Sequence, residues 1–98
     1  MRLSAAYVDA IKAAARETFG DDAVVRLFGS RVDDAQRGGD IDLHVEAAPA
    51  TADLVHEAHF RALVWQRLDE PQVDVVVAAR GATPRWIDRA AYRDGLVL

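Results

Sequence analysis

The sequence contains no cysteine, which excludes a disulfide framework, a thiolate zinc site and a cysteine nucleophile. It also lacks a long uninterrupted hydrophobic run, so we see neither a signal peptide nor a membrane span and expect a cytoplasmic location. Positive charge is scarce as well, because 12 Lys and Arg stand against 16 Asp and Glu. The resulting net charge of −4 argues against a protein whose main work is binding a nucleic acid backbone, and we do not expect direct nucleic-acid binding.

The composition that remains is that of a globular domain. Hydrophobic residues make up 51% of the chain and charged residues 29%. At 98 residues, the chain is large enough for one hydrophobic core but not for two. We therefore expect a single domain spanning residues 1–98.

The spacing of apolar residues predicts alternating helices and strands. Helices are expected over residues 5–18, from an N-cap at Thr51 to about Leu68, and from Thr83-Pro84 to about Arg93. Apolar runs predict strands over residues 23–28, 40–46 and 73–78, with a short edge strand at 96–98. The expected fold is therefore α/β (α+β), a small mixed β-sheet with helices packed on one side. On the second helix, the core-facing side is expected to consist of Leu54, Val55, Ala58, Ala62 and Trp65.

A turn of small residues follows the first predicted strand. It contains Gly29, Ser30 and Arg31. Because Gly29 has no side chain and that of Ser30 is short, backbone amides here could approach a phosphate group closely. Arg31 directly follows and could reach the same phosphates.

Acidic residues interrupt two of the predicted strands. Asp40 and Asp42 alternate with apolar residues and so share one face of the second strand, about 7 Å apart. Asp74 stands among the valines of the third strand, a local inconsistency that marks a functional site more often than an error. Neighbouring carboxylates repel one another unless a cation neutralises them, and two so spaced can share a pair of Mg²⁺ ions. An all-oxygen donor set favours Mg²⁺ or Mn²⁺ over Zn²⁺.

Together these motifs resemble a known superfamily. Gly29-Ser30, the Asp-Ile-Asp-Leu sequence at residues 40–43 and a later strand aspartate, Asp74, resemble the nucleotidyltransferases typified by DNA polymerase beta. The small size resembles the minimal nucleotidyltransferase (MNT) family within that superfamily. The resemblance implies a polymerase beta-like nucleotidyltransferase fold. It also implies that Asp40 and Asp42 bind the metals, while Asp74 binds metal or activates the acceptor hydroxyl. One departure is Gly39, at a position where a serine commonly precedes the first aspartate.

The resemblance also implies a function. Larger relatives carry an additional helical domain, so here a partner is expected to supply the acceptor. Minimal members are often encoded beside a helical HEPN protein, an RNase toxin, and act as its antitoxin by transferring AMP from ATP to a hydroxyl of that partner. The competing interpretation is a binding module that neutralises its partner by contact, without turnover. Transfer to a small molecule or to an RNA end is disfavoured by the missing acceptor domain and the acidic net charge.

Several other polar or aromatic residues have ordinary explanations. Arg85, Arg89 and Arg93 recur every four residues and could meet a triphosphate, although a solvated helix face is the simpler interpretation. His44 shares the strand face of Asp42, close to the expected metals. The pair His56 and His59 has no evident third ligand and is read as surface or packing. Trp65 and Trp86 are expected in the core.

Overall fold

The computed structural model describes residues 3–29, 41–68 and 72–98. Within these ranges the protein is a small mixed α/β domain with a four-stranded sheet and three helices. The elements in chain order are α1 (Ala5–Phe19), β1 (Val24–Phe28), β2 (Ile41–Ala47), α2 (Leu54–Leu68), β3 (Val73–Ala79), α3 (Trp86–Asp94) and β4 (Leu96–Val97). An element of the expected type lies in each expected place, although α2 and α3 begin later than expected. None of the helices in these ranges combines the length and apolar character needed to cross a membrane.

The helix ends show which side chains satisfy the free backbone amides. The Ser4 hydroxyl accepts a hydrogen bond from the Tyr7 amide at 3.1 Å, and α1 ends at Gly20, whose φ is +102°. At the start of α2, the expected N-cap Thr51 is wrong. Asp53 takes that place because its Oδ1 accepts the His56 amide at 2.9 Å, whereas the Thr51 hydroxyl donates to the Ala48 carbonyl.

The start of α3 also differs from the expectation. The Thr83-Pro84 pair lies before the helix, which begins at Trp86. Asp88 explains the shift, since its carboxylate reaches back to accept the Arg85 amide at 2.8 Å. A carboxylate in the first turn can satisfy an amide that has no partner within the helix.

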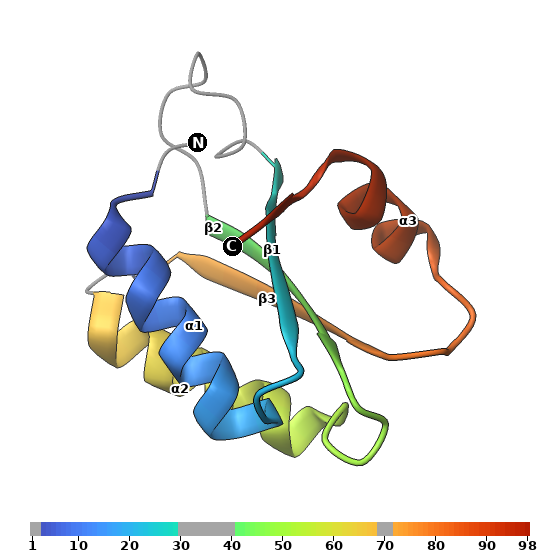
Figure 1. The fold of residues 1–98 in the computed structure, drawn as a ribbon, viewed down its shortest axis with the longest axis horizontal. Coiled ribbons are helices and arrows are strands. Elements are labelled where there is room, and N and C mark those ends of the chain that lie inside the picture. The colour runs from blue at the N-terminus through green and yellow to red at the C-terminus, as the bar shows by residue number, and fades with distance from the viewer. Residues whose placement is uncertain (1–2, 30–40, 69–71) are drawn as a thin grey trace.

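The strands form one sheet in the order β3-β2-β1-β4 (Figure 1). β1 is antiparallel to both β2 and β4, while β2 and β3 are parallel. A parallel pair needs a long crossover, and α2 supplies it. Strands β2 and β3 therefore begin at the same end of the sheet, and β1 ends there.

The hydrophobic core lies between α1, α2 and one face of the sheet. Alternation along β2 directs Leu43 and Val45 into this core, and both side chains are fully buried. From α1 and α2, Ile11, Phe19, Phe60 and Val64 pack against them. Figure 1 shows α1 and α2 together on one side of the sheet, with α3 apart from them.

The expectation that the helices pack on one side is right for α1 and α2 but wrong for α3. His44 lies between Leu43 and Val45, so its side chain points to the opposite face of the sheet. There it is fully buried and bonded to Asp88 of α3. Both faces of the sheet thus carry a helix.

The expected core-facing side of α2 is also wrong. Leu54, Val55, Ala58, Ala62 and Trp65 are all exposed. The buried positions are Phe60, Val64 and Leu68, which recur every four residues and form a second apolar stripe on the same helix. Phe60 packs against Phe19 of α1 with 5.5 Å between ring centroids, which fixes the side of α2 that faces the core.

Candidate functional site

The predicted site centres on the end of β1, where the turn begins. Phe28 pairs with Asp42 across the β1–β2 ladder, and Gly29 follows with a φ of +79°. A Cβ atom at residue 29 would collide with the Asp42 carboxylate. Glycine is needed here for two reasons, the left-handed backbone and the direct approach of that backbone to the acid.

A second acid lies beside Asp42 on the neighbouring strand. Asp42 and Asp74 are register partners in the parallel β2–β3 ladder. Their side chains project from the face opposite the core, Asp42 half-buried and Asp74 exposed. Adjacent strands are about 4.8 Å apart, so the two carboxylates are neighbours. Three predicted site residues, Gly29, Asp42 and Asp74, therefore meet at one end of the sheet.

The other three predicted site residues, Ser30, Arg31 and Asp40, lie outside the described residues. In the ranges that the structure does describe, no three His, Cys, Asp or Glu side chains are grouped to hold a metal. The donors that are placed, Asp42 and Asp74, offer only carboxylate oxygens. This chemistry suits Mg²⁺ or Mn²⁺ and not a soft metal.

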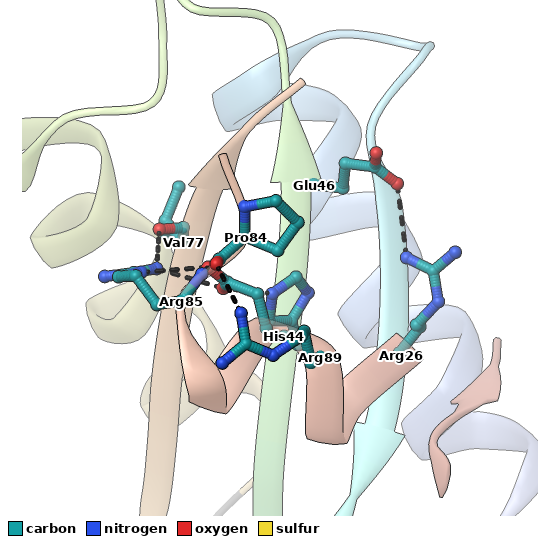
Figure 2. A network of polar contacts seen from close by, with 8 residues as sticks. Arg26, His44, Glu46, Val77, Pro84, Arg85 and Arg89 are labelled. Atoms are coloured by element: carbon teal, nitrogen blue, oxygen red, sulfur yellow. Dashed lines mark hydrogen bonds and ion pairs between the residues drawn. The ribbon is translucent and has the colours of Figure 1, made fainter. Parts of the chain in front are cut away.

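A polar cluster on the same face of the sheet, with two buried residues, His44 and Asp88, was not anticipated. Asp88 of α3 accepts a hydrogen bond from His44 Nε2 at 2.8 Å and is itself 2% exposed. Its other oxygen accepts from Arg85 Nε at 2.9 Å, and the same guanidinium donates to the Val77 carbonyl at 3.0 Å (Figure 2). We call His44, Asp88 and Arg85 the α3 anchor, since they join helix α3 to strands β2 and β3.

Hydrogen bonds stabilise the negative charge of the buried Asp88 carboxylate in the α3 anchor. Burial of Asp88 opposes its ionisation, but the hydrogen bonds from Arg85 and His44 outweigh burial and hold the pKa of Asp88 well below its usual range. Because the ionised carboxylate can only accept, His44 Nε2 must donate. His44 Nδ1 is buried and has no hydrogen-bond partner among the described residues.

Aromatic rings enclose the His44 imidazole. Tyr92 meets it edge-on with 5.1 Å between ring centroids, and Phe28 does so at 6.4 Å. The Arg26 guanidinium lies over the Tyr92 ring, 4.8 Å from its centroid, and forms an ion pair with Glu46 at 3.2 Å. Burial raises the pKa of Tyr92. His44 is thus held as part of the packing beneath α3.

The three arginines at the start of α3 and along it are exposed, but they have different hydrogen-bond partners. Arg85 belongs to the α3 anchor. Arg89 donates to the Pro84 carbonyl at 3.1 Å, as Figure 2 also shows, and Arg93 pairs with Asp94 at 2.8 Å. All three side chains therefore match the interpretation as exposed surface, and Arg85 is 57% exposed although it also bonds to the buried Asp88.

Of the remaining residues considered from the sequence, the histidine matches its expectation and the two tryptophans do not. His56 Nδ1 lies 2.7 Å from Asp53 beside the start of α2, consistent with a surface role. The expectation that Trp65 and Trp86 lie in the core is wrong, because they are 47% and 73% exposed. Sequence could have suggested the α3 anchor by one signal only, the position of His44 on the Asp42 face of β2.

No protein-family model matches this sequence, and a search of curated proteins finds no match. The case for any function therefore rests on the motifs and on the geometry described above.

Proposed function

We propose that the protein is a metal-dependent nucleotidyltransferase. The observation that carries the proposal is the meeting of Gly29, Asp42 and Asp74 at one end of the sheet. Segments from three separate strands bring a glycine backbone and two neighbouring carboxylates together. The spacing of these residues in the sequence is also what the resemblance to polymerase beta-like nucleotidyltransferases rests on.

The residues would divide the work between metal and phosphate. Asp42 and Asp74, with Asp40, would hold Mg²⁺, two ions in the arrangement that the resemblance implies. Bound magnesium would neutralise charge on the phosphates of ATP. The turn that begins at Gly29 would present backbone amides to the same phosphates. Ser30 and Arg31 are the side chains proposed to assist there.

The acceptor is proposed from the resemblance. It would be a hydroxyl of a HEPN-type RNase toxin, and transfer of AMP to it would make this protein the antitoxin. The second candidate is a module that neutralises the same partner by contact. The half-buried position of Asp42, packed against the backbone of Gly29, favours a built site over solvent-facing strand charge.

The metal site is tested by nucleotide binding. We expect Asp42→Asn/Asp74→Asn to abolish magnesium-dependent ATP binding, because both changes keep the size of the side chain but remove its charge. Isothermal titration calorimetry with and without EDTA measures this. The matched control is Asp9→Asn/Asp21→Asn, which removes two exposed acids elsewhere and should leave affinity unchanged. Equal affinity in the two double variants would show that Asp42 and Asp74 are not metal ligands.

Transfer of AMP to the partner distinguishes the enzyme from a module that acts by contact alone. The chain is mixed with ATP, Mg²⁺ and a HEPN protein encoded beside it, and the partner is weighed by mass spectrometry. The enzyme adds one or more AMP units. No mass gain, together with retained neutralisation by Asp40→Ala/Asp42→Ala, would favour the module.

A further inference from the structure

Helix α2 carries an exposed apolar stripe along one side. Leu54 and Val55 are 78% and 77% exposed, Trp65 is 47% exposed, and the exposed Ala58 and Ala62 lie between them. The spacing of three, four and seven residues places them on one side of the helix. We call these five residues the α2 stripe.

The other sides of α2 are occupied. Phe60, Val64 and Leu68 face the core. His56 and Arg67 face α1, His56 through a ring contact with Phe19 and Arg67 through paired hydrogen bonds to Glu17 at 2.6 and 2.9 Å. With 3.6 residues per turn, the α2 stripe lies roughly opposite this α1-facing side. It therefore points outward beyond β3, the edge strand of the sheet.

The edge of β3 is already protected against strand addition. Arg61 of α2 donates to the Val75 carbonyl at 3.4 Å, and Arg85 donates to the Val77 carbonyl at 3.0 Å. An added strand would have to displace both guanidinium groups from the outward carbonyls that it needs. The occupant best suited to this side of the molecule is therefore a helix lying on the α2 stripe, and not a strand.

We propose that the α2 stripe binds the α2 stripe of a second copy of this chain, with the two helices antiparallel. The stripe has bulky residues at both ends and small ones in the middle, so it is complementary to itself when reversed. With the two-fold axis near residue 60, Ala58 lies opposite Ala62 and Val55 opposite Trp65. The alanines allow the two helices to approach closely, toward the lower end of the 8–10 Å range of helix packing.

The helix dipoles favour the same direction, because an antiparallel pair sets the N-terminus of each α2 beside the C-terminus of the other. The nearby charges Glu57 and Arg61 point elsewhere. Glu57 lies three and seven residues before the buried Phe60 and Val64, on the side of α2 that faces the core, and Arg61 donates to the Val75 carbonyl of β3. Neither charge therefore lies between the two stripes.

The size of the stripe sets the strength of the association. A 15-residue helix is about 22 Å long and about 10 Å wide, so the stripe covers only a few hundred Å². A standard interface buries about 800 Å² per partner. We therefore expect a monomer–dimer equilibrium that depends on concentration. This dimer does not depend on the proposed nucleotidyl transfer.

The absence of native cysteine makes the register directly testable. Ala58→Cys and Ala62→Cys are prepared separately and oxidised alone and as an equimolar mixture. The antiparallel register predicts that the mixture forms a disulfide-linked dimer in at least tenfold higher yield than either variant alone. A mixture of Ala62→Cys with Ala6→Cys, an exposed alanine on α1, should give no such dimer. Cross-linking of Ala58→Cys alone as strong as that of the mixture would overturn the antiparallel pairing.

Sedimentation velocity over a concentration series tests the association itself. The unmodified chain should shift from monomer to dimer, and Ala58→Glu should weaken dimerisation at least tenfold because it buries a charge between the helices. Ala6→Glu is the matched control and should dimerise normally. Circular dichroism confirms that each variant is folded. A chain that stays monomeric throughout the concentration series would overturn pairing with a second copy.

Discussion

Gly29 is the residue on which the candidate site depends most directly. Its φ of +79° disfavours any side chain, and a Cβ atom would collide with the Asp42 carboxylate. We expect Gly29→Ala to lower the free energy of unfolding by more than the roughly 1–2 kcal/mol that a left-handed backbone alone costs. It should also displace Asp42 and so weaken magnesium-dependent ATP binding. Urea denaturation and calorimetry measure the two effects.

Gly81 offers a matched control for this substitution. Its φ of +84° is nearly the same, but a Cβ atom there would meet nothing within 4 Å. Gly81→Ala should therefore lower the free energy of unfolding only by the roughly 1–2 kcal/mol that a left-handed backbone costs, and should leave nucleotide binding intact. If the two variants lost equal stability and both bound ATP normally, the contact between residue 29 and Asp42 would have no structural importance.

At the scale of single elements, the faces of the strands were predictable because the alternation of apolar residues assigns each side chain to one face only. In β3 the valines at positions 73, 75 and 77 face the core, so Asp74 must face the other way. The same alternation identified the face of Asp42. These two acids could thus be assigned to one face from sequence alone, although only the parallel register makes them direct partners.

Helix α2 was not predictable in the same way because it has two apolar stripes. Two sets of apolar residues have helical spacing: the first is Leu54, Ala58 and Trp65, and the second is Phe60, Val64 and Leu68. The choice depends on α1, whose Phe19 packs on Phe60. Likewise, the bond between His44 and Asp88 joins residues 44 positions apart, and no local pattern indicates it.

The start of α2 provides a test at this scale. Asp53→Ala should lower the urea midpoint, because it removes the acceptor of the His56 amide hydrogen bond at 2.9 Å. Thr51→Ala should have a smaller effect, since the Thr51 hydroxyl bonds to the Ala48 carbonyl outside the helix. Helix content by circular dichroism should fall only in the first variant. A larger loss from Thr51→Ala would place the N-cap where the sequence pattern predicted it.

At the scale of the whole molecule, the two faces of the sheet are held by different forces. The α1–α2 side shares a continuous apolar core. Helix α3 buries only Asp88 and Ala91, and it is tied to the sheet largely through the polar α3 anchor. Such a helix can open without exposing the main core. We infer that α3 is the least stable of the three helices.

Hydrogen exchange at single-peptide resolution tests this inference and its dependence on pH. Amides of α3 should exchange through openings of lower free energy than those of β2. Asp88→Asn should lower the free energy of opening of α3 further by about 1–2 kcal/mol, because hydrogen bonds to a charged carboxylate are lost.

The contribution of Asp88 also depends on pH. The pKa of Asp88 is held below its usual range in the closed state, so the stabilisation that Asp88 gives to α3 is complete above about pH 4–5 and declines as the pH falls further. Between pH 6 and pH 3, after correction for intrinsic exchange, α3 of the unmodified chain should lose protection while the Asp88→Asn variant changes less. Equal protection of α3 and β2, unchanged by pH and by the substitution, would show that the α3 anchor is not what holds the helix to the sheet.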